Sequence, residues 1–472
     1  MKILLATIFY PPTHIGGTEV YTHALAKNLQ RLGHTVRVVC AENWGQGESA
    51  WNDYCDEVYE GVPVRRLYLN WTKMAEVNRS LYDNPVVAEF FQKFLTEWQP
   101  DVVHVTSCQT LSASIIAVAK RANAAVVVTL MDFWFLCPRV TLRRGDGALC
   151  SGRVEAWECL ECLLHDTKIE RWAKNLLPEQ VHRTFLTRLS QQDRLTGMRG
   201  LRGMAMNIDD RRRVLRDALA QADYIISPSR FVKRYFEQNG FSVPIDVIPM
   251  GNELSWLTTC AGKLPSPVIR FGYIGQILPI KGIHHILQAF HALPEQSGAE
   301  LYIHGALDKE PLYTEQLYQL SNGDARIHFV GPYQRSEIAR VLANLDVVVF
   351  ASVWHETYGL VIQEAFATQT PVIASNVGAI PEHVLDEVNG LLFQAENVPD
   401  LARQMQRVID EPNLLARLQV GIQPVKTIER EARELEQIYQ SVSNPLSREQ
   451  NFDHYAFEHA QGTRHQRIEC DA

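Results

Sequence analysis

The feature that most constrains this fold is an alternation of short apolar segments and amphipathic segments that occurs in both halves of the chain. In the first half, strands are predicted at Lys2–Ile8, Val36–Cys40, Asp101–Thr106, Ala125–Leu130 and Tyr224–Ser227, and helices at Thr18–Leu32, Pro85–Trp98, Leu111–Arg121 and Phe231–Gln238. Short apolar strands separated by helices predict a parallel sheet that helices cover on both faces.

The alternation restarts after Thr259–Pro267, a polar segment with one glycine and two prolines that is typical of a linker between domains. Beyond it, strands are predicted at Ile269–Ile274, Glu300–His304, Arg326–Val330, Asp346–Phe350 and Pro371–Ala374, and helices at Ile283–Ala292, Ser336–Ala343 and Leu360–Thr368. Sheets of this kind bind ligands at the carboxyl ends of their strands. We therefore expect an α/β fold with two such domains and a functional site in the cleft between them.

These patterns divide the chain into four parts. The first domain is expected over 1–258, with a cysteine-containing insertion near 137–162, and the second domain over 268–424. A helix within 425–443 is expected to pack back toward the first domain. The remainder, 444–472, is polar and without periodicity, so we expect a disordered tail without a function of its own.

Charge and cysteine usage exclude several classes of protein. The formal net charge of −8 disfavours a nucleic-acid binder. No apolar run reaches the ~18 residues that span a bilayer, and Pro11-Pro12 interrupts the first one, so we expect a cytoplasmic protein. The odd number of cysteines, nine, disfavours a secreted disulfide framework.

Two glutamates, Glu356 and Glu364, follow the predicted strand Asp346–Phe350. A helix is expected to begin near Thr357 or Tyr358, and at ~1.5 Å per residue the stretch between the two carboxylates spans ~10–12 Å. A helix start offers free N–H groups and partial positive charge to a phosphate, and Gly359 allows close approach. One carboxylate then suits sugar hydroxyls and the other suits ribose hydroxyls.

The stretch from Glu356 to Glu364, with Gly359-Leu360 and Glu364-Ala365, resembles the signature of glycosyltransferase family 4. Matching segments are Phe271–Gly275 with Lys281-Gly282, Ser227–Ser229, Val247–Asn252, and Pro371–Ala374 with Gly378. The resemblance covers residues 1–443 and implies the GT-B fold, in which two Rossmann-like domains with parallel sheets face each other across a cleft.

The resemblance also implies roles for single residues. Glu356, Lys281 and Asp132 are the candidate catalytic residues, and Lys281 is expected to offset the charge on the departing diphosphate. The candidate donor-binding residues are Gly16, Gly17, Gly275, Gln276, Lys281, Glu356, Thr357, Tyr358, Gly359, Leu360 and Glu364.

Two positions depart from the family. Gln276 follows Gly275 where an arginine is usual, so one cation for the phosphates is missing or comes from elsewhere. Met131 precedes Asp132 where relatives commonly carry a histidine, and a thioether neither donates a hydrogen bond nor carries charge. Either Asp132 or the Met131 carbonyl takes over part of that role, or the activity is lost or altered.

Four cysteines follow the predicted strand Ala125–Leu130, namely Cys137, Cys150, Cys159 and Cys162. They are candidate ligands of a structural zinc ion that would hold an irregular loop in place, and the alternatives are uncoordinated thiols or a redox pair. The stretch from Lys168 to Arg216 contains twelve Lys or Arg residues and only five acidic residues, and apolar residues are interspersed among them. Solvated helix faces explain such a stretch more often than the alternative, peripheral contact with the inner membrane face or a lipid-linked acceptor.

The sequence therefore predicts a retaining, metal-independent, hexosyltransferase-like enzyme that takes a nucleotide diphosphate sugar and acts on a glycan, lipid-linked or other acceptor. Cell-surface polysaccharide or glycoconjugate synthesis is the expected setting, and no cofactor is expected for catalysis. The alternatives are a catalytically impaired nucleotide-sugar or glycan-binding protein on the same fold, and a nucleotide-sugar epimerase.

Overall fold

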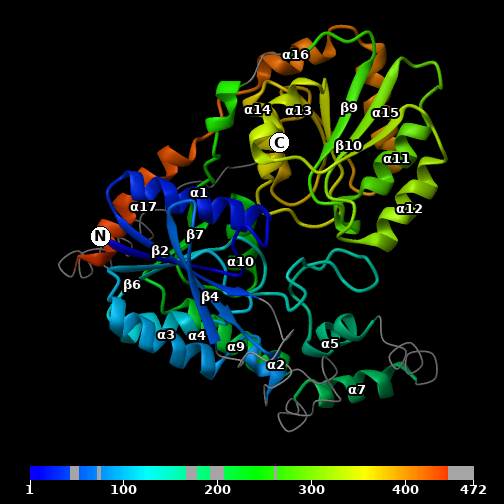
Figure 1. The fold of residues 1–472 in the computed structure, drawn as a ribbon. Coiled ribbons are helices and arrows are strands. Elements are labelled where there is room, and N and C mark those ends of the chain that lie inside the picture. Colours follow the sequence, from blue (N-terminus) through cyan, green and yellow to red (C-terminus); the bar gives the residue numbers. More distant parts are fainter. Residues whose placement is uncertain (43–52, 72–75, 166–177, 192–206, 260–262, 445–472) are drawn as a thin grey trace, which may run out of the picture.

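The structure is a computed structural model that describes residues 1–42, 53–71, 76–165, 178–191, 207–259 and 263–444. The described chain forms two lobes, each built around one sheet (Figure 1). The expected tail and parts of the expected linker and of the basic stretch 168–216 lie outside the described residues.

The sheet of the first lobe has the strand order β3-β4-β2-β1-β5-β6-β7-β8. Its strands are β1 (Lys2–Thr7), β2 (Thr35–Glu42), β3 (Asp53–Tyr59), β4 (Val62–Tyr68), β5 (Val102–Val105), β6 (Ala125–Thr129), β7 (Tyr224–Ser227) and β8 (Asp246–Val247). Neighbouring strands are parallel except β3 and β4, which are antiparallel. The expected parallel sheet is confirmed, and an antiparallel hairpin that was not predicted extends it at this edge, where Glu60 and Gly61 both have positive φ and form a two-residue turn.

Helices cover both faces of this sheet. One face packs against α3 (Pro85–Trp98), α4 (Ser114–Arg121), α9 (Ile208–Leu219) and α10 (Arg230–Gln238), and the other against α1 (Gly17–Arg31) and α17 (Ile428–Ser443). The start of α3 follows from local sequence, because the Asn84 side chain accepts hydrogen bonds from two backbone N–H groups and Pro85 occupies the first helical position. A short helix, α2 (Val77–Ser80), precedes α3. Two further helices, α5 (Ala156–Leu164) and α7 (Glu179–Leu189), pack on each other and project from the lobe (Figure 1).

The sheet of the second lobe has the order β11-β10-β9-β12-β13-β14, and its neighbouring strands are all parallel. Its strands are β9 (Ile269–Ile274), β10 (Ala299–His304), β11 (Ile327–Gly331), β12 (Val347–Phe350), β13 (Val372–Ser375) and β14 (Gly390–Phe393). One face packs against α11 (Ile283–His291), α12 (Pro311–Ser321), α15 (Val398–Asp410) and α16 (Leu414–Gly421), and the other against α13 (Ile338–Ala343) and α14 (Leu360–Ala367).

The last helix, α17, follows the second lobe in sequence but packs on the first. Its Tyr439 hydroxyl lies 2.6 Å from Nδ1 of the buried His104 on β5. Its Glu431, only 1% exposed, accepts hydrogen bonds from the Tyr21 hydroxyl at 2.8 Å and from the Gly251 N–H at 2.5 Å. Helix α17 therefore connects the end of the second lobe to the sheet of the first lobe and to the segment around Gly251 that follows β8. Among the described helices, none combines the length and the apolar character that spanning a bilayer requires.

The docking of α17 predicts a pH-dependent stability. Burial raises the pKa of Glu431 from 4.5 to about 7, so its favourable contribution is fully present below pH 4.5 and is lost as the pH rises through about 7. Glu431→Gln mimics the protonated form. The difference in unfolding free energy between this variant and wild type should therefore grow in favour of the variant from pH 5 to pH 8, by up to about 3 kcal/mol, and the melting temperature of the variant should rise relative to wild type accordingly. Scanning fluorimetry at both pH values tests this, and a difference between the two proteins that does not change with pH contradicts it.

Candidate functional site

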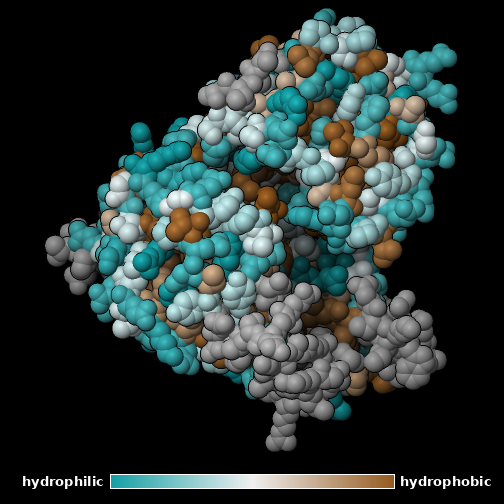
Figure 2. Space-filling model, in the orientation of Figure 1, coloured by the Kyte–Doolittle hydropathy of each residue, from teal (hydrophilic) through white to brown (hydrophobic). Residues whose placement is uncertain are grey.

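A cavity of about 450 Å³ opens between the two lobes, at the carboxyl ends of the strands. Figure 2 shows the molecule hollowed there. Every residue predicted for catalysis or donor binding lines this one cavity: Gly16, Gly17, Asp132, Gly275, Gln276, Lys281, Glu356, Thr357, Tyr358, Gly359, Leu360 and Glu364. The structure thus brings them together, and their individual roles stay predictions.

Glu356 is the most constrained carboxylate of the cavity. It is 6% exposed, and its Oε1 accepts hydrogen bonds from Lys281 Nζ at 2.7 Å, from Trp354 Nε1 at 2.7 Å and from the Ser352 hydroxyl. Lys281 also lies over the ring of Trp354, 5.2 Å from its centroid. With Oε1 held by three donors, the other carboxylate oxygen has the capacity to accept hydrogen bonds from a ligand.

The helix that follows Glu356 begins later than expected. Helix α14 starts at Leu360 rather than near Thr357 or Tyr358, and Gly359 is its N-cap with φ +94°. This left-handed backbone is strained for most residues but not for glycine, which explains why the helix cannot extend back through it. Gly359, Leu360 and Val361, at the start of α14, line the cavity together with Glu356, as the phosphate hypothesis requires.

Glu364 lies one turn into α14 and is 5% exposed. Its Oε1 accepts a hydrogen bond from Arg335 Nη1 at 2.6 Å. Arg335, which precedes α13, was not predicted, because no local motif connects it with a glutamate 29 residues away. In the part of the chain that the structure describes, Lys281 and Arg335 are the two lysine or arginine side chains that line the cavity.

Asp132 brings a third carboxyl group to the cavity, from the first lobe. Burial raises its pKa to about 6, although a hydrogen bond from the Trp134 N–H at 2.8 Å acts in the opposite direction. Burial also raises the pKa of Glu19, at the start of α1. A carboxyl group with a pKa near the working pH suits proton transfer in a cleft.

Three hydrogen bonds cross the cavity and hold the lobes together. Gln276 donates to the Ile15 carbonyl at 3.2 Å, Thr357 donates to the Met131 carbonyl at 2.9 Å, and Tyr358 donates to the Met250 carbonyl at 2.7 Å. The two unusual positions, Gln276 and Met131, are therefore both used as contacts between the lobes.

The four cysteines predicted to bind zinc line one small cavity of about 20 Å³, together with Arg139, Arg143 and Arg144. Cys150 accepts a hydrogen bond from the Gly152 N–H, and Cys159 accepts one from Arg212. Burial raises the pKa of Cys159 to about 11. Across the described ranges, no three His, Cys, Asp or Glu residues are placed to hold a metal ion, so zinc stays an untested expectation.

Only part of the basic stretch can be placed. Lys168, Arg171, Lys174, Arg194, Arg199 and Arg202 lie outside the described residues. Of the others, Arg211 is buried and donates to the Trp134 carbonyl, Arg213 pairs with Asp210 at 2.6 Å, and Arg183 lies over the Trp157 ring. Intramolecular contacts therefore account for these three, and membrane contact stays a prediction.

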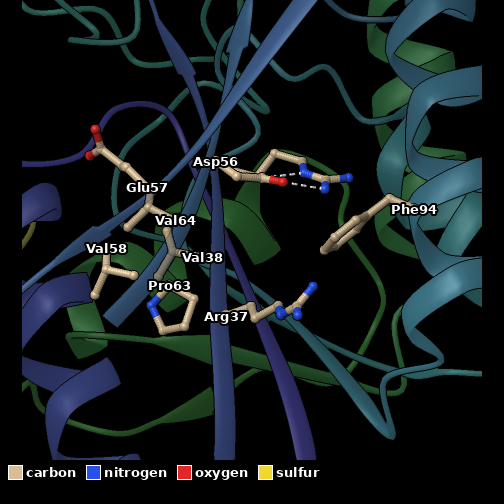
Figure 3. Close-up of a pocket in the computed structure, with 9 residues that line it drawn as sticks. Arg37, Val38, Asp56, Glu57, Val58, Pro63, Val64 and Phe94 are labelled. Atoms are coloured by element: carbon tan, nitrogen blue, oxygen red, sulfur yellow. Dashed lines mark hydrogen bonds and ion pairs between the residues drawn. The ribbon is translucent and has the colours of Figure 1, made fainter. Parts of the chain in front are cut away.

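A second hollow, of about 270 Å³, lies at the edge of the first sheet (Figure 3). Arg65 donates two hydrogen bonds of 2.6 Å to Asp56 there, and its guanidinium lies over the Phe94 ring. None of the predicted catalytic or binding residues lines this hollow, so the cleft between the lobes is the candidate site.

Comparison with known proteins identifies the two lobes. Residues 16–251, half of the chain, match the protein-family model for the Glycosyl transferase 4-like domain, and residues 262–421 match Glycosyl transferases group 1.

The similarity to individual proteins is low in sequence identity. The chain is 31% identical over 139 residues to an uncharacterized glycosyltransferase of Methanocaldococcus jannaschii, covering 29% of this chain and 35% of that relative. It is 24% identical over 438 residues to a glycogen synthase of Mycobacterium tuberculosis, covering 87% of each. The structure of Anabaena HepE in complex with UDP and glucose superposes with a TM-score of 0.61 at 18% identity, over 93% of this chain and 99% of that one. This last likeness concerns the fold, and it confirms the predicted GT-B class.

The packing around Glu356 predicts a matched pair of glycine substitutions. Gly378 and Gly298 have nearly the same φ, +63° and +64°, so alanine strains both backbones by about 1 kcal/mol. A Cβ at Gly378 would lie 2.4 Å from the Glu356 carbonyl oxygen and 2.6 Å from its nitrogen, whereas a Cβ at Gly298 meets nothing within 4 Å. Gly378→Ala should therefore cost about 1–3 kcal/mol more than Gly298→Ala in chemical denaturation. Equal losses would contradict the packing described here.

Proposed function

This chain belongs to the glycosyltransferase family that the two matched models describe, and we propose that it is a retaining enzyme that moves a sugar from a nucleotide diphosphate sugar to a glycan, lipid-linked or other acceptor. The observation that carries the proposal is the Lys281–Glu356 pair beside the start of α14, in the cavity between the lobes. A role in cell-surface polysaccharide or glycoconjugate synthesis is part of the proposal, and the glycogen synthase among the relatives supports a polysaccharide product.

The two ion pairs of the cavity suggest how a donor is received. Lys281 pairs with Glu356 and Arg335 pairs with Glu364, so each carboxylate is already held in place by a cation. A diphosphate entering beside Gly359 competes for the two cations, while hydroxyl groups of the sugar and ribose take their place on the carboxylates. Charge is then exchanged between partners rather than created in a partly dry cavity, which limits the cost of desolvation.

The same groups would stabilise the departing diphosphate. Lys281 and the free N–H groups of α14 offer positive charge where negative charge develops as the bond to the sugar breaks. We propose on this ground that the reaction needs no metal ion. The three hydrogen bonds that cross the cavity hold the lobes close and restrict the entry of water.

The acceptor would approach from the first lobe. Asp132 faces the cavity from that side, and its raised pKa suits a group that receives the proton of an acceptor hydroxyl. Retention of configuration requires the acceptor oxygen and the departing phosphate oxygen to lie on the same face of the sugar.

One observation favours a second candidate, a protein that binds the donor but transfers poorly. Met131 replaces the histidine usual in relatives, and its side chain is 8% exposed. Met131→His discriminates the two candidates in a sugar-transfer assay. A gain of activity supports the impaired protein, and unchanged or lower activity supports an enzyme that works with methionine at this position.

The proposed function predicts nucleotide-sugar binding that depends on Glu364. Sugars carried by uridine, guanosine or adenosine diphosphate are screened for thermal stabilisation, where a ligand at 100 times its Kd adds about 2.7 kcal/mol. Glu364→Ala should abolish the stabilisation, and Lys281→Ala should lower kcat by about 10²–10³-fold if transfer proceeds as described. Glu315→Ala removes an exposed glutamate of α12, outside the cavity, and is the matched control. The proposal fails if no nucleotide sugar stabilises the wild type and Glu364→Ala changes nothing.

A further inference from the structure

The insertion that follows β6 sends a hairpin toward the second lobe. We name residues 141–150 the insertion hairpin. Arg143 and Leu149 form an antiparallel bridge in it, and backbone hydrogen bonds join Arg144 to Ala148 and Cys150 to Leu142. Its sequence neighbour Val140 lines the cavity between the lobes. The hairpin therefore lies next to the candidate donor site although it belongs to the first lobe.

Arg143 makes the contact with the second lobe. Its Nη1 and Nη2 donate to the two carboxylate oxygens of Glu396, at 2.9 and 3.0 Å, and Nη1 also donates to the Val353 carbonyl. The Arg143 side chain is 19% exposed, and its hydrogen bonds lower the pKa of Glu396. The Glu396 side chain is 42% exposed, so the pair lies at the surface, but its bidentate geometry restricts both the direction and the distance of the partner.

The Val353 carbonyl lies in the loop that holds Glu356. Its neighbours Ser352 and Trp354 both donate hydrogen bonds to Oε1 of Glu356. The Val353 N–H in turn donates to the Ile280 carbonyl at 2.9 Å, next to Lys281. A guanidinium that holds the Val353 carbonyl therefore acts on the loop that orients the Lys281–Glu356 pair.

Backbone strain occurs on both sides of this contact. Val140 and Leu142, which both precede Arg143, have φ of +67° and +52°, and Glu396 has φ of +65°. Positive φ is costly for such side chains, most of all for a β-branched residue. Conformations of this kind persist where the surroundings impose them, and they concentrate at functional contacts.

The base of the hairpin is anchored to its own lobe. Arg139 donates to the Cys162 carbonyl at 3.2 Å, and a Cβ at Gly145 would lie 2.4 Å from the Cβ of His165, at the end of α5. Leu142 is buried in the core of the first lobe. Because the base of the hairpin is fixed to the first lobe, the position of Arg143 relative to the Val353 loop depends on how the two lobes are placed.

We propose that the insertion hairpin is a clasp between the lobes, in which Arg143 is a positioning residue for Glu356. Its contacts with Glu396 and the Val353 carbonyl keep the lobes closed and hold the loop Ser352–Glu356 in its donor-binding arrangement. Arg143 touches neither donor nor acceptor in this role. The proposal rests on the proposed function for its effect on the donor, but the effect on closure does not depend on it.

The test combines a charge swap with two measurements. Arg143→Ala should raise the donor KM by about ten-fold, equivalent to about 1.4 kcal/mol, and should enlarge the radius of gyration seen by small-angle X-ray scattering of the ligand-free protein. Glu396→Ala should do the same to a smaller extent, because the Val353 contact remains. The double variant Arg143→Glu with Glu396→Arg rebuilds the ion pair in reverse, so it should bring the radius of gyration back toward wild type. Its KM should stay raised, because a glutamate at position 143 cannot donate to the Val353 carbonyl.

Arg144→Ala is the matched control. Arg144 lies in the same hairpin, but its carboxylate neighbours Asp146, Glu158 and Glu161 all belong to the first lobe, so this variant should leave both measurements near wild type. Arg143→Lys keeps the charge but cannot make the two-pronged contact, and an intermediate KM is expected. The clasp is overturned if Arg143→Ala matches Arg144→Ala in both measurements, or if the swap leaves the radius of gyration as large as Arg143→Ala does. A wild type that binds no nucleotide sugar overturns the proposed function instead, while scattering still tests the clasp.

Discussion

The buried carboxylate of Glu356 is the constraint around which the second lobe is organised. A charge that is 6% exposed needs partners, and Lys281, Trp354 and Ser352 all supply them to a single oxygen. Lys281 lies on the segment that follows β9, and Ser352 and Trp354 lie on the segment that follows β12, and these two strands are neighbours in the sheet. The parallel order of the sheet is what brings their carboxyl ends to one edge, so the fold and the ion pair depend on each other.

The two lobes do not behave as independent bodies joined by one linker. Helix α17 returns from the second lobe to the first, where Glu431 bonds to Tyr21 and to the backbone of Gly251. Three hydrogen bonds cross the cavity, and the insertion hairpin reaches over at its side. Closure is thus held from several directions. The bonds across the cavity all use backbone carbonyls, α17 uses the buried Glu431, and Arg143 uses the exposed Glu396 together with the Val353 carbonyl.

Those parts of the site that lie close together along the chain could be predicted from the sequence. Glu356, Gly359 and Glu364 form one linear motif after an apolar strand, and their placement on one cavity wall follows from the geometry of a strand, a turn and a helix. Arg335 and Arg143 lie outside any such motif, because their partners stand 29 and 253 residues away and only folding brings them near. The β3–β4 hairpin was not predicted, because β3 is polar and mostly exposed and the adjacent Arg65 and Arg66 interrupt the apolar residues of β4, so neither strand shows the apolar run of the others.

The charges of the cavity show why Gln276 can stand where relatives place an arginine. Lys281 and Arg335 are each matched by a glutamate before any ligand arrives, so neither cation is left unpaired in a partly buried cavity. A third cation at position 276 would be repelled by Lys281 and Arg335, the two cations among the described lining residues, whose partners Glu356 and Glu364 are already taken. The neutral amide avoids this repulsion and instead binds the Ile15 carbonyl of the opposite lobe. Arg335, held by Glu364, supplies the second positive charge from another element, and the departure at position 276 becomes a contact that helps to close the cleft.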